Sequence, residues 1–391
     1  MTRVRTSVVL LLYYLLSVLS TSTYAEGDVQ LHGFFSQNFL YSNKNKFFGD
    51  SDDGSFEFYE LGLNASWAIN SRFRLAGQAL IRDAGSSDDG RPRIDYLFAE
   101  YLFWSGEVDE VSLRLGRVLN PYGFFSATRD VAGTRPGILL PQSVYVDANR
   151  QFALSADGVQ LNWVRPIGDG ELNLDVSKVE PRTSDPDLEV NILGRPFPGK
   201  ITGDRSTWLG KLTYDYDFGR WRFAWTQGKV YVDYEPAPVD VLLSGQLYFR
   251  PTVLSVQHQR ERWGFTAEVM RRQSTLTGLG FPTAERTGDN FFLQADYRHE
   301  NFSYFLRYDR MIKDNHDPYG RKLEAANRGP AYTAYAKDWT LGGRWSVSQN
   351  LALAAEFHAV EGTAWLSSVQ NDGIPGSKYW NLLLFSVSAR Y

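Results

Sequence analysis

Apolar and polar residues alternate along the last part of the chain. From Leu383 to Tyr391 every odd-numbered residue is apolar or aromatic, and polar residues such as Ser388 and Arg390 stand between them. A period of two describes a β-strand whose two faces meet different surroundings. Sixteen segments of this kind follow one another from Val29 onwards, so the sequence predicts an all-β fold.

The connections between these segments alternate in length. Short turns such as 70–71 and 300–301 follow the even-numbered segments, whereas long polar stretches such as 42–55, 181–204, 233–245, 274–288 and 312–337 follow the odd-numbered ones. A soluble β-sandwich also alternates, but it does not sort its loops by length in this way. The pattern therefore predicts a sixteen-stranded antiparallel transmembrane β-barrel over residues 26–391, with short periplasmic turns and long extracellular loops.

Composition agrees with a barrel. Aromatic residues make up 15% of the chain, which suits rings of aromatic side chains at the two lipid interfaces. The hydrophobic fraction of 43% is low for a helical membrane protein but fits a barrel, in which alternate strand residues face water. A net charge of -4 argues against a nucleic-acid partner, because nucleic-acid binding requires a concentrated basic surface. Several tryptophans stand near the ends of predicted strands: Trp67, Trp104, Trp163, Trp221, Trp263, Trp339 and Trp345.

The N-terminus predicts export. Arg3 and Arg5 precede an apolar run from Val8 to Leu19, and Ala25 offers a small residue at a cleavage point. This pattern indicates a secretory signal peptide over residues 1–25; an uncleaved anchor is the alternative. As a helix the apolar run is about 18 Å long, which is short for spanning a bilayer. No later segment has the roughly 18 consecutive apolar residues of a membrane-spanning helix, so the expected location is the outer membrane, as a closed barrel.

The sequence offers no catalytic or metal site. The chain has no Cys, which excludes thiol catalysis and disulfide bonds. The five His are scattered, and the nearest Ser–His pair, Ser255 and His258, has opposite strand parity, so the two side chains point to different sides of the sheet. Segment 49–54 resembles part of a calcium loop, but Gly54 and Leu61 stand where such a loop needs oxygen ligands. We therefore predict no enzyme activity, no cofactor and no metal.

One long connection, residues 119–151, differs from the others. Its Gly and Pro residues disfavour both a strand and a long helix. Many apolar side chains are unfavourable in a loop that is exposed to water. This loop is therefore expected to fold into the barrel and pack on the inner wall. The apolar residues are Phe124, Phe125, Ile138, Leu139, Leu140, Val144 and Val146.

The stretch LGRVLNPYG at 115–123 follows the fifth predicted strand and opens this loop. Together with the sixteen strands, the third long loop and the terminal aromatic residue, it resembles the Gram-negative outer-membrane porin superfamily of sixteen-stranded trimers. The chain is more similar to the phosphate-porin-like and uncharacterised porin-like branch than to the enteric general porins. Segments 128–130 and 134–136, each with an arginine, stand in place of the acidic signature of the enteric third loop.

This resemblance implies several further properties. The third loop would constrict the pore, and the protein would form a homotrimer. Its partners would be outer-membrane lipid, lipopolysaccharide and the barrel-assembly machinery, with Tyr391 and Phe385 as the C-terminal assembly signal.

Strand alternation assigns many charged residues to the lumen. The expected inward basic residues are Arg74, Arg82, Arg114, Lys211, Arg222, Arg272, Arg298, Arg307, Arg344 and Arg390, and the acidic ones are Glu60, Glu100, Asp175, Asp215, Glu268, Asp296, Asp309 and Glu356. Opposed rows of both signs would create a transverse field across the pore. In the third loop, a positive bias at the constriction is expected from Arg129, Arg135 and Arg150, with Asp130 and Asp147 beside them. The alternative is that most of these charges are paired and only keep the lumen wet.

The predicted function is passive diffusion of small hydrophilic solutes or ions through an outer-membrane porin, with a mild preference for anions. The alternative is a structural or adhesive surface barrel with a closed lumen, in which the long loops are the active part. Single-channel conductance separates the two.

Overall fold

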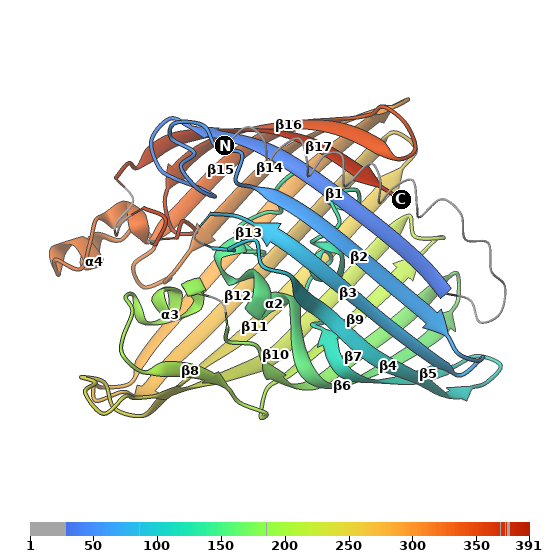
Figure 1. Ribbon diagram of the computed structural model, residues 1–391, viewed down its shortest axis with the longest axis horizontal. Coiled ribbons are helices and arrows are strands. Elements are labelled where there is room, and N and C mark those ends of the chain that lie inside the picture. Colours follow the sequence, from blue (N-terminus) through green and yellow to red (C-terminus); the bar gives the residue numbers. More distant parts are fainter. Residues whose placement is uncertain (1–28, 86, 185, 368, 372, 374–375) are drawn as a thin grey trace.

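The computed structural model describes residues 29–391 except 86, 185, 368, 372 and 374–375, so the predicted signal peptide lies outside the described residues. Within them, seventeen strands form one antiparallel sheet. β1 (Val29–Ser42) pairs with β17 (Tyr379–Arg390), which closes the sheet into a barrel (Figure 1). The short β8 (Lys200–Gly203) is an addition to β10 (Trp221–Glu235), so the closed wall contains the sixteen predicted strands.

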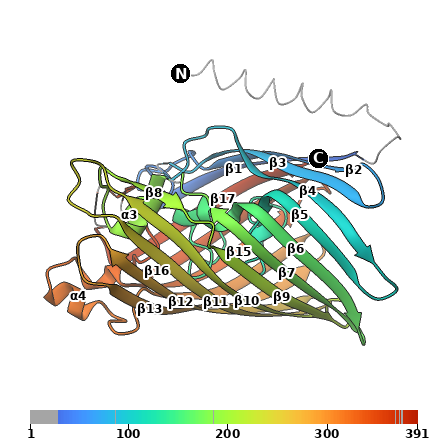
Figure 2. The same cartoon turned by 90° about the horizontal axis from the view of Figure 1, so that it is seen from below.

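The other strands follow the chain around the wall, each paired with its neighbours in sequence. They are β2 (Tyr59–Ala68), β3 (Phe73–Asp83), β4 (Arg93–Ser105), β5 (Glu110–Leu119), β6 (Ser155–Ile167), β7 (Gly170–Pro181), β9 (Trp208–Tyr216), β11 (Gly245–Arg260), β12 (Trp263–Gly278), β13 (Ala284–His299), β14 (Phe302–Ile312), β15 (Tyr335–Ser346) and β16 (Leu351–Gly362). They slant across the wall in both ribbon views (Figure 1; Figure 2).

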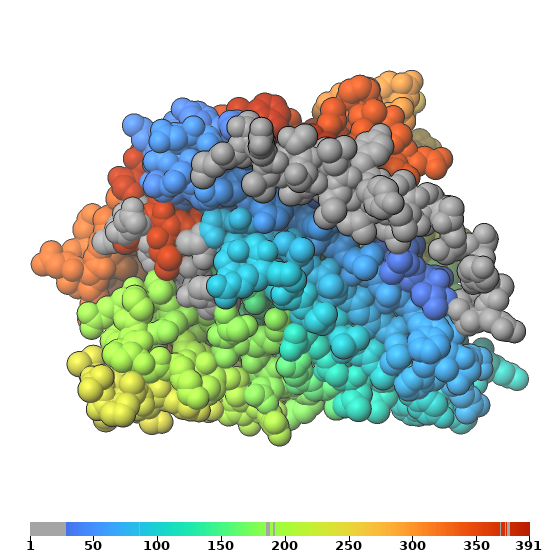
Figure 3. Space-filling view, in the orientation of Figure 1, coloured from blue at the N-terminus to red at the C-terminus, as the bar shows by residue number. Residues whose placement is uncertain are grey.

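Helices are confined to the connections. They are α2 (Arg150–Leu154), α3 (Pro186–Leu193) and α4 (Arg321–Ala325), with short 3-10 turns at Ser126–Thr128, Asp147–Asn149 and Ala331–Thr333. In the described part of the chain, no helix is long and apolar enough to cross a membrane. The orange α4 and its neighbouring loop project beyond the wall at the rim with the long loops (Figure 3).

Each strand has one face toward the lumen and one toward the outside. On β13, Phe292 and Gln294 are buried within the barrel, whereas Leu293 lies on the outer face with about half of its surface exposed. This is the alternation that the sequence predicts, because the side-chain period of a strand is two. The outward apolar residues form the surface that the transmembrane barrel predicted from the sequence would turn toward lipid.

Four strands are longer than expected. β10 to β13 have 15 or 16 residues each, and the loops between them are only 236–244 and 279–283. The stretches 233–245 and 274–288, expected to be loops, are therefore partly strand. Polar residues can extend a strand there because neighbouring backbones still pair, as Gln246 does with Thr277.

Aromatic side chains gather on the outer face beside the short turns. Trp221 stacks on Phe223 with ring centroids 5.9 Å apart, and Phe302 stacks on Trp345 at the same distance. These side chains stand at strand ends, where an amphipathic ring lies at the level of the lipid headgroups. The chain also ends at this rim (Figure 1).

The last residue takes part in closing the barrel. The Tyr391 backbone N–H donates to the Gly33 carbonyl at 2.8 Å, and the Gly33 N–H donates to the Tyr391 carbonyl at 3.2 Å. Deleting Tyr391 should therefore reduce the amount of folded protein in the outer-membrane fraction, while Tyr391→Phe should keep it. A truncated protein that inserts at the normal level would contradict a role for Tyr391 in assembly.

Candidate functional site

The third loop, residues 120–154, joins β5 to β6 and turns into the barrel, where α2 lies (Figure 1). Its beginning and end are both held by Glu268 on the inward face of β12. The Glu268 carboxylate accepts hydrogen bonds from the Phe124 backbone N–H at 3.0 Å and from the Tyr145 hydroxyl at 2.6 Å. The loop therefore reaches from β5 to β12.

Two further wall carboxylates hold the middle of the loop. Asp309 on β14 accepts a hydrogen bond from the Ser143 N–H at 3.2 Å, and Glu356 on β16 accepts one from the Leu139 N–H at 3.3 Å. Hydrogen bonds to a carboxylate are stronger than those between neutral groups. Because both carboxylates are buried, they anchor the loop instead of lining open water.

Two arginines of the barrel wall also hold the third loop in place. Arg307 on β14 donates to the Leu139 carbonyl at 3.1 Å, and Arg344 on β15 donates to the Ala132 carbonyl at 2.6 Å. Five of the charges that alternation assigns to the lumen thus point inward and bind the backbone of the third loop: Glu268, Asp309, Glu356, Arg307 and Arg344.

Apolar side chains of the loop pack on the wall at the same time. Ile138 and Leu139 belong to a buried cluster that includes Leu40 of β1. Val144 belongs to another cluster, which includes Val253 of β11. Removing this apolar surface from the water of the lumen favours the inward position of the loop, as its composition predicts.

Between the loop and the first strands lies a buried group of five guanidinium groups and five carboxylates, which we call the arginine–carboxylate cluster. Arg135 of the loop binds Glu60 of β2 with an N–O distance of 2.5 Å, and Arg150 binds Asp95 of β4 at 2.9 Å. The charges balance within the cluster, as buried charges require. Its members are Arg82, Arg93, Arg129, Arg135, Arg150, Glu60, Asp88, Asp95, Asp130 and Asp147.

This cluster differs from the positively biased constriction that the sequence suggested. Arg129, Arg135 and Arg150 are only 3%, 8% and 2% exposed, and each faces a carboxylate. Burial lowers the pKa of Arg135, but the charge and hydrogen bond of Glu60, together with the charges of Asp130 and Asp147, raise it, so the pKa lies above its ordinary value. The three loop arginines fasten the loop to the wall, and their charge is neutralised where they stand.

Asp95 is a member of the cluster that sequence reasoning missed. The pairing of β3 with β4 shifts register between Gln78 and Ala79, which marks a β-bulge. Strict alternation from Leu97 places Asp95 on the outer face, yet its side chain is completely buried and binds Arg150. A bulge leaves no mark in the hydrophobic pattern, so no sequence signal identifies this residue.

Most other inward charges on the wall have polar partners nearby. Arg114 binds Glu100 at 2.7 Å and Arg222 binds Asp215 at 2.6 Å. Arg74 also binds Glu100, Arg298 binds Gln259, Asp296 accepts from Gln294, and Arg390 binds the Gln349 carbonyl. Lys211 lies near Asp175. The Arg–Glu and Arg–Asp ion pairs match the alternative interpretation, in which paired charges keep the lumen wet, whereas Arg298, Arg390 and Asp296 bind neutral groups and keep their charges.

Among the residues that the structure describes, three inward cations lack such partners, and we call them the cation group: Arg272 on β12, Arg286 on β13 and Lys313 just after β14. Arg286 stands opposite Ser274, on the same face of the sheet as Arg272. Lys313 has the same parity as the inward Asp309. Among the described residues no carboxylate forms an ion pair with any of the three, and their positive charges act unfavourably on one another.

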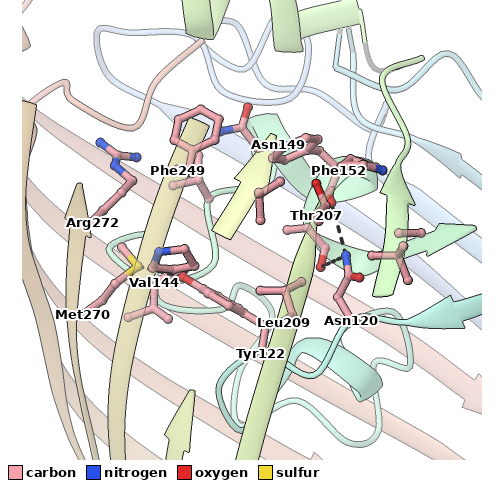
Figure 4. Close-up of a pocket in the computed structure, with 17 residues that line it drawn as sticks. Asn120, Tyr122, Val144, Asn149, Phe152, Thr207, Leu209, Phe249, Met270 and Arg272 are labelled. Atoms are coloured by element: carbon pink, nitrogen blue, oxygen red, sulfur yellow. Dashed lines mark hydrogen bonds between the residues drawn. The ribbon is translucent and has the colours of Figure 1, made fainter. Parts of the chain in front are cut away.

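Arg272 lines a cavity between the third loop and the wall made by β6, β7 and β9 to β12. The cavity has a volume of about 120 Å³. Most of its lining is apolar, for example Val144, Leu209, Phe249 and Met270, and Arg272 is the charged residue among those that line it (Figure 4).

Comparison with known proteins identifies the architecture. No protein-family model matches the chain, and no curated protein matches it. Among solved structures, the outer membrane channel DcaP of Acinetobacter baumannii matches with a TM-score of 0.58 and 13% identity, over 94% of this chain and 99% of that chain. An anion-selective porin from Comamonas acidovorans matches with a TM-score of 0.56 and 12% identity, over 94% and 100%. Salmonella typhi OmpF matches with a TM-score of 0.54 and 10% identity, over 93% and 98%.

The chain has the porin fold. The predicted resemblance to Gram-negative porins is therefore confirmed at the level of the fold. The porin fold typically carries no enzymatic activity. The Ser–His pair nearest in sequence points to two sides of the sheet, as strand parity predicts: Ser255 binds Glu268 inside the barrel, while His258 lies on the outer face against Trp221, with ring centroids 4.1 Å apart.

Proposed function

We propose that this protein is a porin through which small hydrophilic solutes diffuse, with a preference for anions. The observation that supports the preference is the cation group, Arg272, Arg286 and Lys313, of which Arg272 lines a cavity whose other lining residues carry no charge. Uncompensated charge of one sign in a narrow aqueous passage raises the local concentration of the opposite ion.

The size of this effect follows from Coulomb's law. A unit charge about 6 Å from a permeating ion, at an effective dielectric constant of about 20, contributes about 3 kcal/mol before screening by salt. Paired charges contribute much less, because the two partners nearly cancel at a distance. The proposed preference therefore comes from the cation group, while the buried loop arginines contribute little.

We also propose that residues 1–25 are removed on export and that the mature barrel forms a homotrimer in the outer membrane, in contact with lipid and lipopolysaccharide. A matching structure of Vibrio cholerae OmpT, 12% identical, is a trimer form. Insertion of the barrel would depend on the barrel-assembly machinery, with Tyr391 and Phe385 in its C-terminal signal.

One observation favours a second function, a structural surface barrel with a closed lumen. The third loop binds inward-facing side chains of β2, β12, β14, β15 and β16 and so occupies much of the barrel's cross-section. A lumen filled in this way would carry no ions, and the long loops would then perform the function.

Conductance in a planar lipid bilayer distinguishes the two functions. The purified protein should produce stepwise increases in current as single channels insert, with chloride as a permeant ion. The opposing result is a protein that inserts as a folded barrel and produces no current steps. That result would refute the proposed channel and support the second function, a structural barrel with a closed lumen.

A further inference from the structure

We propose that the cavity beside the third loop binds small amphipathic anions, which have an aromatic or branched aliphatic body and a carboxylate or sulfonate group. This inference rests on the proposed channel and names a class of solute that it selects. It concerns the cavity between the loop and the wall from β6 to β12.

The apolar lining points to an apolar solute body. The loop contributes Tyr122 and Val144, and the wall contributes Leu209, Val230 and Phe249 (Figure 4). Apolar surface removed from water contributes about 25 cal/mol per Å², so a solute with an apolar body is stabilised there. A sugar or a hydrated ion gains nothing from such walls, because they cannot replace its hydrogen bonds with water.

Most polar groups of the lining are already used within the protein. Asn120 donates from Nδ2 to the carbonyls of Phe152 at 3.3 Å and Ala153 at 3.2 Å. The Thr207 hydroxyl accepts from the Tyr231 N–H at 2.9 Å. These groups hold the loop and the strands in place, so they offer few hydrogen bonds to a strongly hydrophilic solute.

Arg272 supplies the recognition of negative charge. Its guanidinium group lies at one side of the apolar side chains in the close-up (Figure 4), and no carboxylate of the described residues pairs with it. A guanidinium group binds a carboxylate or sulfonate through two parallel hydrogen bonds. An uncompensated arginine beside an apolar wall therefore matches a solute with an anionic end and an apolar end.

The volume suits an organic molecule. The cavity has a volume of about 120 Å³, close to the roughly 150 Å³ of an engineered apolar cavity that binds benzene, so it suits one small aromatic or branched body. An inorganic anion would fill a small part of it and leave the apolar walls without contact.

The test uses the full-length exported protein in a planar bilayer and measures block of the chloride current by added benzenesulfonate. Isethionate, a small hydrophilic sulfonate, is the comparison probe. Both probes are permanently ionised, so they do not leak through the lipid as neutral acids. Benzenesulfonate should block at millimolar or lower concentration, and isethionate should block only at much higher concentration.

Two variants locate the block, and one variant serves as a control. Arg272→Gln should raise the half-blocking concentration of benzenesulfonate about tenfold, because a charge-assisted hydrogen bond is lost. Val230→Thr keeps the shape of the wall and should raise this concentration about threefold by placing a hydroxyl against the apolar body. Arg271→Gln is the matched control, since Arg271 lies on the outer face of the same strand, bound to Asp289 at 2.7 Å. It should leave the block unchanged.

Each outcome decides between the claims. Equal block by the two sulfonates, or block that Arg272→Gln and Val230→Thr leave unchanged, would overturn the binding inference while the chloride current still supports the channel. A folded protein without any chloride current would overturn the proposed channel and this inference together.

Discussion

Replacing Glu60 with glutamine is expected to release the third loop from the wall. The Glu60 carboxylate binds the Arg135 guanidinium with N–O distances of 3.2 and 2.5 Å, and it also lies 3.4 Å from Arg82. Glu60→Gln leaves Arg135 buried without a charge partner, and breaking a buried ion pair in this way costs about 3 to 5 kcal/mol. Single-channel recordings should show larger current fluctuations and a higher mean conductance.

Two comparisons make this result specific. The double variant Glu60→Gln with Arg135→Gln removes both charges and should restore much of the steady current, because no buried charge is left unpaired. Arg117→Gln breaks the Arg117–Asp157 pair on the outer face, 2.8 Å long, and should leave the current as it is. A steady wild-type current in Glu60→Gln would mean that the arginine–carboxylate cluster does not hold the loop.

Neutralising part of the cation group should weaken the preference for anions. In Arg286→Gln with Lys313→Gln, two uncompensated charges are lost, each worth about 3 kcal/mol at about 6 Å before screening. Even a fifth of that energy changes the permeability ratio of chloride to potassium about threefold. The reversal potential in a KCl gradient should therefore move toward zero.

The arginines of the third loop are expected to affect the reversal potential much less than the cation group does. Arg129 and Arg135 are buried beside carboxylates, so neutralising them should lower the yield of folded barrel but move the reversal potential little. The opposite result would be a large shift of the reversal potential in Arg129→Gln with Arg135→Gln and no shift in Arg286→Gln with Lys313→Gln. It would mean that the third loop, and not the cation group, determines the ion selectivity.

Much of the barrel can be predicted from the sequence because lipid and water impose a period of two on every strand. Phe292 and Gln294 differ from Leu293 in burial as alternation predicts, and the terminal residue Tyr391 pairs with Gly33 of β1. The inward direction of Glu268 also follows from parity. Each of these features depends only on residues that are close in the sequence or on the pairing of two strands, so the sequence is enough to predict it.

The site could be predicted only in part, since it depends on contacts between distant segments. Alternation places Arg272 in the lumen, but Arg286 and Lys313 fall in stretches expected to be loops, where no apolar pattern marks the strand or its end. The loop arginines 129, 135 and 150 were expected to leave a positive charge in the pore. Their partners Glu60 and Asp95 come from β2 and β4, and the bulge beside Asp95 cannot be seen in the sequence.

The central claim is that this barrel is an open channel in which uncompensated cations favour anions. The reversal potential of the purified wild-type protein in a steep KCl gradient tests it most directly. We predict discrete channel currents whose reversal potential lies on the side of the chloride equilibrium potential. A reversal potential on the potassium side would contradict the anion preference, and a folded, inserted protein without current would contradict the channel itself.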